Sequence, residues 1–268
     1  MRLDVQMMEQ GLVPSREKAR ALIMAGKVTV NGKPADKPGM NIPEQSVIHL
    51  AEDPIPFVSR GGLKLQKAVD VFQINLSDII AADIGASTGG FTDCMLQHGA
   101  KKVYAVDVGY GQLDWRLRND ARVVVMERTN ARNMVPDWFE RPLGFASIDV
   151  SFISLQLILP PLHNCLSAGA QVVALIKPQF EAGRAQVGKN GVIRDKEVHF
   201  SVCESILKSA ALLGYDIKGL SFSPVTGPKG NIEFLAFLQK SQPDSEPISL
   251  PAGCIRDIVE EAHSLLDR

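Results

Sequence analysis

The sequence predicts an α/β protein in which a mostly parallel, seven-stranded sheet of Rossmann-like layout follows a small N-terminal α/β domain. Two observations lead to this prediction. From residue 60 to about 240, apolar strand-like runs alternate with helical patterns, and parallel strands need such helical connections. Residues 1–50 instead indicate two short helices and a hairpin, and the two prolines within residues 51–59 mark an interdomain linker.

The N-terminal domain is predicted from cap and turn signals. Ser15 is placed to cap the N-terminus of its second helix, and Gly26 is placed to end that helix. A short strand at 28–30 is followed by Asn31-Gly32, which is a strong hairpin signal because both residues tolerate a positive φ.

Seven strands are expected between residues 60 and 240, each a short apolar run. They are 79–84, 102–108, 122–126, 144–149, 171–176, 216–222 and 231–238. The last two are joined by a loop with no room for a crossover helix, so we expect them to be antiparallel to each other. Residues 241–268 are expected to form a second linker and a short amphipathic helix.

Composition excludes several classes of protein. The chain is 45% hydrophobic and 22% charged with a formal net charge of −1, as in ordinary soluble proteins. Its four cysteines lie far apart without a C-x-x-C pair, so we expect no metal site and no redox motif. No apolar stretch approaches ~18 residues, and the N-terminus lacks a signal-peptide pattern. We therefore expect a cytoplasmic protein without stable membrane association.

The most informative run is Asp83–Phe91, which follows an apolar strand and begins a helix. Glycines let the backbone approach a ligand closely, and a helix N-terminus offers free N–H groups. Ser87 stands where a dinucleotide-binding loop has its second glycine, whereas an acid two residues before the first glycine is typical of methyltransferases. We therefore expect this loop to bind S-adenosylmethionine, with Asp83 near the methionine ammonium. The cofactor residues expected in this run are Asp83, Gly85, Ser87, Gly89 and Phe91.

Neighbouring strand ends extend the expected cofactor site. Asp107 ends the next strand beside Val108, where a carboxylate can accept both ribose hydroxyls of an adenosine. Asn130 lies just past the third strand, where such folds place an adenine contact, and a helix cap is its equal alternative. Open parallel sheets bind ligands at the carboxyl ends of their strands, so we expect all these residues at one edge.

Asp149, at the end of the fourth strand, indicates the kind of methyl acceptor. Many enzymes that methylate an exocyclic amine carry N/D-P-P-Y/F there, but this chain has Asp-Val-Ser-Phe from Asp149 to Phe152. Methylation of pyrimidine carbon 5 needs a cysteine in this loop or the next, and neither loop has one. A ribose hydroxyl is a poor nucleophile and needs a basic or cationic group aimed at its oxygen.

Lys177 ends the fifth strand after an apolar run and is the expected base or cation. The pKa of a lysine falls when the side chain is buried or lies beside another cation, and Lys64 is expected nearby. Asp149 and Glu233, the latter expected within the seventh strand, would orient the two ammonium groups. The structural alternative is that Lys177 merely extends its ammonium group from a strand end to solvent.

Six runs of the sequence match the motifs of a known family. They are Arg60–Lys64, Asp83–Thr92, Asp107–Leu113, Glu127–Arg132, Asp149–Ser154 and Lys177–Glu181. Together they resemble the TlyA rRNA methyltransferases of the FtsJ-like group over nearly the whole chain. The resemblance implies a catalytic tetrad that maps onto Lys64, Asp149, Lys177 and Glu233. It also implies that the substrate is a cytidine 2′-hydroxyl of 23S rRNA and, for some members, another in 16S rRNA. The RNA could be free or part of a ribosomal subunit.

The resemblance further implies that residues 1–50 are an S4-type RNA-binding domain. Residues 1–37 hold seven Lys and Arg against four acids, which suits a phosphate-rich partner but would also suit a solvated face. In the S4 fold the second helix meets RNA phosphates, and Arg16 and Arg20 share one face of that helix. The RNA-binding residues expected are Arg2, Arg16, Lys18, Arg20 and Lys27.

Two functions of other classes stay open from the sequence. Some relatives are named hemolysins, and a membrane-active hemolysin would need a membrane span or a strongly amphipathic insertion segment. A non-catalytic RNA-binding protein is the second alternative, although a decayed site would be expected to lose its acids first. The target nucleotide and the oligomeric state do not follow from the sequence.

Overall fold

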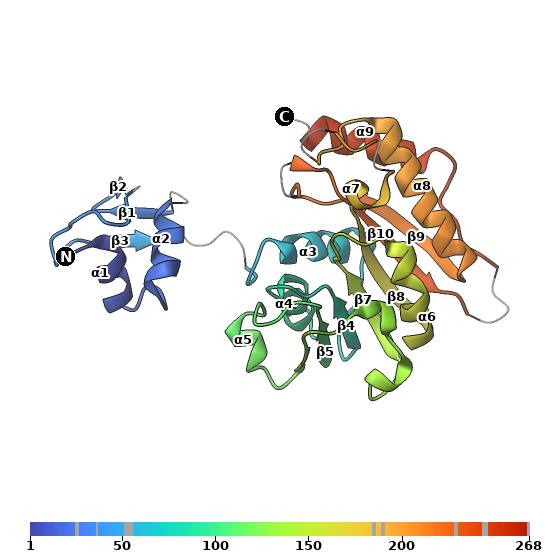
Figure 1. Cartoon of the computed structure of the whole chain (residues 1–268), viewed down its shortest axis with the longest axis horizontal. Coiled ribbons are helices and arrows are strands. Elements are labelled where there is room, and N and C mark those ends of the chain that lie inside the picture. Colours follow the sequence, from blue (N-terminus) through green and yellow to red (C-terminus); the bar gives the residue numbers. More distant parts are fainter. Residues whose placement is uncertain are drawn as a thin grey trace. The chain divides into compact units, whose positions relative to one another are not determined.

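The computed structural model forms two compact units, Met1–Pro56 and Phe57–Arg268 (Figure 1). It describes residues 1–24, 27–35, 37–50, 56–183, 186–188, 191–227, 230–242 and 246–266. The predicted helix end at Gly26 and residues 51–55 of the predicted linker lie outside the described residues. Phe57 is buried in the second unit, so packing there begins three residues before the predicted start at residue 60.

The first unit packs two helices on a small antiparallel sheet. Its elements are α1 (Leu3–Glu9), α2 (Arg16–Met24), β1 (Val28–Val30), β2 (Lys33–Pro34) and β3 (Ile48–Leu50). The central strand is β1, which pairs with β2 and β3 on its two sides. Apolar residues of both helices and of β1, among them Leu3, Ile23 and Val28, form one buried cluster. Burial of such side chains stabilises this unit.

The cap and turn of the first unit follow the sequence signals. Ser15 Oγ accepts a hydrogen bond from the N–H of Lys18 at 3.2 Å, which satisfies one of the free donors at the start of α2. Asn31 and Gly32 have φ values of 50° and 77°, as a two-residue hairpin turn requires. Both predictions are confirmed.

The second unit is built on a seven-stranded sheet (Figure 1). Its strands are β4 (Ile80–Ile84), β5 (Lys102–Val106), β6 (Val123–Met126), β7 (Leu143–Ile148), β8 (Leu166–Ile176), β9 (Tyr215–Phe222) and β10 (Phe234–Lys240). The strand order is β6-β5-β4-β7-β8-β10-β9, and β10 is antiparallel to both of its neighbours. The predicted Rossmann-like fold is confirmed. β10 starts three residues later than predicted, however, so Glu233 immediately precedes this strand and does not lie within it.

Helices cover both faces of this sheet. They are α3 (Gly61–Phe72), α4 (Gly90–Gln97), α5 (Trp115–Arg118), α6 (Leu159–Cys165), α7 (Pro178–Glu181), α8 (Lys196–Leu212) and α9 (Cys254–Leu266), with short 3-10 turns η1 (Ala131–Asn133), η2 (Pro136–Trp138) and η3 (Leu155–Leu157). Ala82 of β4 belongs to the same buried cluster as residues of α6 and α8. Its neighbour Asp83 points to the other face, where it is bonded to Thr92 of α4. On that face Phe72 of α3 also stacks on Phe237 of β10, with ring centroids 5.0 Å apart.

The predicted C-terminal helix is present as α9 and lies beside α8 (Figure 1). Val259 and Ala262 are buried on its inner side, as the amphipathic pattern predicts. A hydrogen bond of 2.9 Å between His199 Nδ1 of α8 and His263 Nε2 of α9 joins the two helices. Within the described part of the chain, no helix is both long and apolar enough to cross a bilayer.

Candidate active site

Strand register brings the predicted site residues to one edge of the sheet. The last residue of β4 pairs with the last residues of β5 and β7. The residues that follow these strands, Gly85, Asp107 and Asp149, therefore leave the sheet side by side. The antiparallel β10 places its first residue opposite the last residue of β8. Glu233 before β10 and Lys177 after β8 consequently lie at this same edge.

The four residues of the predicted tetrad form an alternating chain of charges. Lys64 Nζ lies 2.6 Å from Glu233 Oε2 and 3.7 Å from Asp149 Oδ2. On the other side of Asp149, its Oδ1 lies 2.5 Å from Lys177 Nζ. The order is anion, cation, anion, cation, so the cluster carries no net formal charge.

These side chains are largely removed from water. Lys64 and Lys177 are 9% and 8% exposed, and Glu233 is fully buried. A buried ammonium or carboxylate is strongly disfavoured without a partner, so each ion depends on its neighbour. Lys177 therefore does not extend to solvent, which removes the structural alternative considered for it.

Ser151 is a polar residue of this cluster that the sequence analysis did not single out. Its Oγ accepts a hydrogen bond of 3.0 Å from Lys177 Nζ. The only sequence signal was its place two residues after Asp149, at the end of a strand. Ser151 and Asp149 together hold the ammonium of Lys177 at the edge of the sheet.

Two cavities, of about 330 and 490 Å³, share four lining residues: Gly85, Ser87, Asp149 and Ser151. The first cavity is also lined by Phe91 and by the other three members of the tetrad. The second cavity is also lined by Asp107, Val108 and Asn130. Volumes of this order are typical of small-molecule sites. The tetrad thus borders a cavity that shares lining residues with the one beside Asp107.

The loop after β4 approaches the neighbouring backbone closely. Gly85 has a φ of +86°, and a Cβ there would lie only 2.5 Å from the carbonyl oxygen of Asp149. A residue other than glycine would be strained and would displace that backbone. Ser87 adopts a φ of 49°, and its N–H donates to Asp107 Oδ2 at 2.7 Å. The loop is therefore fixed against the next strand end.

Asp83 supports this loop from inside the protein. Thr92 donates to its Oδ2 from both N–H and Oγ–H, at 2.9 and 2.7 Å, and Ser147 Oγ–H donates to its Oδ1 at 3.2 Å. The carboxylate borders the first cavity but has no exposed surface. Burial raises its pKa to about 7, against the lowering effect of the bonds from Thr92. Its contact with a methionine ammonium stays a prediction, whereas its bonds to α4 are present in the structure.

Asp107 and Asn130 border the second cavity. Asp107 is half-buried, and its two oxygens accept N–H bonds from Ser87 at 2.7 Å and from Gly109 at 2.6 Å. Each oxygen can accept a further bond, since a carboxylate offers about four acceptor positions. Asn130 Oδ1 accepts a bond from the N–H of Arg132 at 3.1 Å, so it caps η1. The cap alternative is therefore correct, while the adenine contact stays a prediction.

Gly89 differs from the other predicted cofactor residues. A Cβ at this position would overlap the side chain of Leu117 and come within 2.8 Å of Leu113. Gly89 has a φ of +94° and lies at the N-cap of α4, so its backbone conformation and its packing on α5 both require glycine. It does not line either of the two cavities. Its neighbour Gly90 lines the first one.

A loop between β9 and β10 contributes lining residues that the sequence analysis missed. Val225, Thr226 and Gly227 line the first cavity, and a Cβ at Gly227 would overlap the carboxylate of Glu233. The sequence of this loop does not indicate a role in the site, because a loop rich in Pro and Gly is usually only a turn. Gln112, which lines the second cavity beside Ser87, was likewise not assigned a role.

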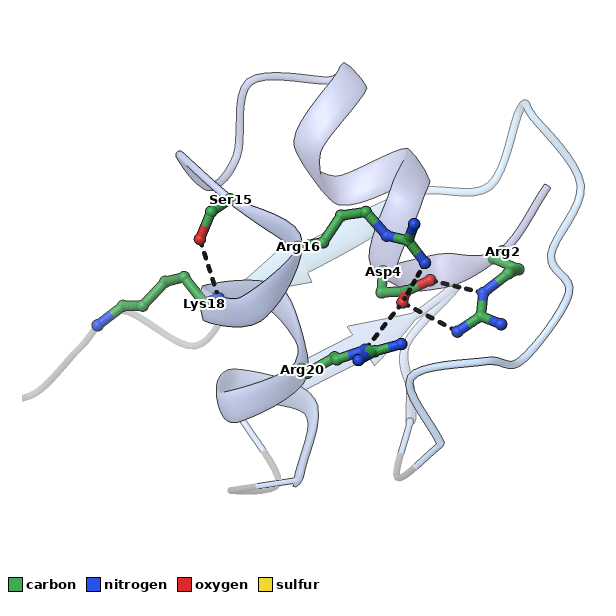
Figure 2. Close-up of polar contacts among 6 residues, drawn as sticks. All are labelled: Arg2, Asp4, Ser15, Arg16, Lys18 and Arg20. Atoms are coloured by element: carbon green, nitrogen blue, oxygen red, sulfur yellow. Dashed lines mark hydrogen bonds and ion pairs between the residues drawn. The ribbon is translucent and has the colours of Figure 1, made fainter.

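The arginines predicted to bind RNA gather in the first unit (Figure 2). Arg2, Arg16 and Arg20 all form ion pairs with Asp4, a residue the sequence analysis did not select. The side chain of Lys18 points away from this group (Figure 2). Lys27 is half-buried just before β1. Three of the five predicted residues thus form one cluster.

Comparison with known proteins matches each unit to a family. The profile of FtsJ-like methyltransferases matches residues 57–240, and that of S4 domains matches residues 1–48. YqxC of Bacillus subtilis is 53% identical over 266 residues, which cover 99% of this chain and 95% of that protein. The 16S/23S rRNA (cytidine-2′-O)-methyltransferase TlyA of Mycobacterium tuberculosis is 42% identical over 264 residues, covering 98% and 97%. A solved structure from Streptococcus thermophilus is 51% identical, with a TM-score of 0.80, and covers 100% of this chain and 97% of that one.

Proposed function

The chain belongs to the family of FtsJ-like methyltransferases, and from this premise we propose that it methylates a ribose 2′-hydroxyl of ribosomal RNA with S-adenosylmethionine as the donor. The observation that carries the proposal is the paired tetrad beside two cavities that share lining residues. The name of the Mycobacterium tuberculosis relative supports cytidines of 23S and 16S rRNA as targets. We propose residues 1–50 as the RNA-binding domain, 51–59 as a linker, 60–240 as the catalytic domain and 241–268 as a linker with a short helix.

The residues around the second cavity fit an adenosine group. Asp107 presents two partly satisfied oxygens to this cavity, which suits the two hydroxyls of a ribose. Gly85 lets the loop pass close to Asp149, where any side chain would intrude. When bound, S-adenosylmethionine supplies an electrophilic methyl group on a sulfonium. Asp83, Gly85, Ser87, Phe91, Val108 and Asn130 complete the proposed cofactor site.

Lys177 is the proposed acceptor of the hydroxyl proton. The ribose oxygen would gain its bond to the methyl group as the sulfur–methyl bond of the donor breaks, and the oxygen must lose its proton. Nζ of Lys177 can take that proton once it has released its own proton to solvent. The resulting ammonium donates to Asp149 Oδ1 and Ser151 Oγ, the two partners that the structure gives it. Lys64 and Glu233 hold Asp149 from the other side through the 3.7 and 2.6 Å contacts. Placement of the hydroxyl in line with the methyl group lowers the barrier further.

The N-terminal S4 domain is the proposed source of RNA affinity. Its arginines project about half-exposed guanidinium groups, which suit backbone phosphates because their N–H pairs can bind bidentately. Lys18 and Lys27 complete the proposed set. Phosphate contacts fix the register of a protein on its RNA, and we propose that this domain supplies RNA affinity and substrate choice but no chemistry.

The proposal is tested by methyl transfer in vitro. Purified protein is incubated with radiolabelled S-adenosylmethionine and ribosomal RNA or subunits, and the methylated nucleotides are mapped by their resistance to alkaline cleavage. We expect label at a ribose 2′-oxygen with wild-type protein and at least about a hundred-fold less with Lys177→Met. RNA binding without any transfer would instead support the non-catalytic alternative and overturn the proposed enzyme activity.

A further inference from the structure

Asp4 is a fully buried carboxylate surrounded by arginines (Figure 2). Arg2 binds it with two N–H groups, Nε to Oδ1 at 2.9 Å and Nη2 to Oδ2 at 3.0 Å. Arg16 Nη2 and Arg20 Nε both reach Oδ2, at 3.2 and 3.3 Å. A single side chain without exposed surface thus anchors three guanidinium groups.

The three arginines come from two separate parts of the first unit, the start of α1 and the helix α2. Arg2 immediately precedes α1, and Asp4 lies in the first turn of that helix. Arg16 and Arg20 lie one turn apart on α2 and point to the same side (Figure 2). The backbone N–H of Asp4 donates to the carbonyl of Pro38 at 3.1 Å, which fixes the carboxylate relative to a third segment. The relative positions of the arginines are therefore set by where Asp4 is held.

The cluster has more positive than negative charge, and the excess faces water. Three arginines and one aspartate leave a formal charge of +2. The bonds from Arg2, together with those from Arg16 and Arg20, hold the pKa of Asp4 well below its usual range, so its carboxylate stays ionised at neutral pH. The arginine side chains are 44%, 47% and 54% exposed. Each guanidinium has five N–H donors, of which Asp4 occupies one or two, so the outer donors are available to a ligand.

A preformed array of this kind favours binding of a polyanion. An exposed arginine loses rotamer entropy when it is ordered by a ligand, and a side chain that is already held loses less. Guanidinium groups and phosphates pair bidentately, so their mutual orientation affects affinity as well as their charge. The cluster therefore suits adjacent phosphates of a nucleic-acid backbone.

We propose that Asp4 is a positioning residue that holds Arg2, Arg16 and Arg20 as one preformed site for RNA backbone phosphates. The proposal rests on the RNA-binding function proposed for the S4 domain. It gives a negatively charged residue a favourable role in binding a negatively charged partner. Simple electrostatics assigns the opposite role, since removal of a negative charge should strengthen binding. The sign of the effect therefore decides between the two accounts.

The test compares full-length wild-type protein with Asp4→Asn and Glu9→Gln, using a transcript of 23S rRNA at several salt concentrations. Glu9 is an exposed acid at the other end of α1, so Glu9→Gln makes the same charge change away from the cluster. We expect Asp4→Asn to weaken binding about tenfold and to lower the salt slope by about 1, as for a lost phosphate contact. Glu9→Gln should leave binding unchanged or slightly stronger. Stronger binding by both variants overturns the proposal.

A second variant covers the case in which Asp4→Asn does not fold. Arg16→Lys/Arg20→Lys keeps both charges and similar helix propensities but removes the guanidinium geometry that Asp4 organises. We expect weaker RNA binding and a lower salt slope in molecules that circular dichroism shows to be folded. A loss of stability alone reduces the amount of protein that can bind RNA. It does not change how the RNA affinity of the folded molecules depends on salt concentration. An unchanged affinity and slope in this double variant overturn the proposal.

A third variant separates this proposal from the function on which it rests. Arg16→Ala/Arg20→Ala removes both charges, so it should weaken RNA binding whether or not Asp4 matters. If it binds like wild type, the RNA-binding role of this face is wrong, and the positioning role fails with it. If it binds weakly while Asp4→Asn and the lysine double variant bind like wild type, only the positioning role fails.

Discussion

The two units of this protein arrange buried charge in opposite ways. In the second unit, two lysines and two acids alternate and balance, and all four are mostly or fully buried. In the first unit, one buried carboxylate lies beneath three arginines that remain about half-exposed. The first arrangement has no net formal charge, and the second has a formal charge of +2.

This difference indicates that the two charge clusters have different functions. A balanced, desolvated cluster exerts little long-range attraction but can fix the position of a proton at one atom. A cluster with excess charge at the surface attracts and orients a polyanion but is poorly placed to change the protonation of a single hydroxyl. The comparison therefore assigns chemistry to the second unit and RNA affinity to the first, and each assignment can be tested separately.

The largest effect should come from Lys177→Met. This change keeps an apolar stem and removes the proton acceptor, so transfer should fall by about 10²–10⁴-fold while RNA and cofactor affinities change little. Lys218→Met, at an exposed lysine of β9, is the control and should keep full activity. Substantial transfer by Lys177→Met would remove the balanced cluster from the chemistry.

Lys177→Arg sharpens that result. Arginine keeps the positive charge but cannot accept a proton near neutral pH. Inactivity would fit a proton acceptor, and partial activity would fit a purely electrostatic role for residue 177. Single-turnover rates at saturating RNA and cofactor distinguish the two outcomes.

A smaller effect is expected from Asp107→Ala in the second cavity. Loss of hydrogen bonds to a charged acceptor is worth roughly 1.5–3 kcal/mol, so affinity for S-adenosylmethionine should fall by about ten- to a hundred-fold. RNA binding should be unaffected, since the arginine cluster lies in the other unit. Isothermal calorimetry measures the change, and unchanged cofactor affinity in a folded variant would refute the ribose assignment.

RNA binding and cofactor binding should differ in their dependence on salt concentration. If the three arginines meet about three phosphates, RNA affinity should fall by roughly 20- to 40-fold between 50 and 200 mM salt. Cofactor binding involves a compact, partly buried site and should change far less over the same range. Fluorescence anisotropy for RNA and calorimetry for the cofactor provide the two slopes. Equal salt dependence of RNA affinity and cofactor affinity would contradict the assignment of RNA binding to the first unit and cofactor binding to the second.

Asp83 extends the comparison to a buried acid whose hydrogen bonds, among the described residues, come from Thr92 and Ser147. Burial raises its pKa to about 7, whereas Asp4 is shifted in the opposite direction by its arginines. Because the unfolded value is near 3.9, the folded protein binds this proton more tightly, and stability from this group falls as pH rises from about 4 to 7. The stability of Asp83→Asn relative to wild type should therefore increase by about 2 kcal/mol between pH 5 and pH 8. Urea unfolding at both pH values measures it, and a pH-independent difference would refute the raised pKa.

Much of the fold followed from local signals in the sequence. Alternating apolar runs predicted all seven strands, and Asn31-Gly32 predicted the hairpin because its geometry is local. The start of β10 was placed three residues too early, at Asn231. Asn231 and Glu233 are polar residues that are buried just before the strand, and neither their burial nor the start of pairing is visible in the sequence. Pairing of β8 with β10 determines where that strand begins, and such pairing depends on distant residues.

The site was predicted best where motifs coincide with strand ends. Asp107, Asp149 and Lys177 follow strands, so their convergence could be inferred from topology. Ser151 and the loop at 225–227 could not be inferred, because their positions depend on side-chain packing around Lys177 and Glu233. The role of Asp4 was hidden for the same reason: a single acid in a basic segment looks like ordinary charge balance until its burial is known.

The most direct test of the central claim is to remove the proposed acceptor oxygen alone. Wild-type protein is given ribosomal RNA in which the mapped target nucleotide carries a 2′-deoxyribose, with the unmodified RNA as control. We predict methyl transfer to that nucleotide in the control and none in the deoxy substrate, with RNA affinity nearly unchanged because the phosphates remain. Methylation of the deoxy nucleotide would show that a base atom is the acceptor, and the ribose mechanism built on Lys177 would be wrong.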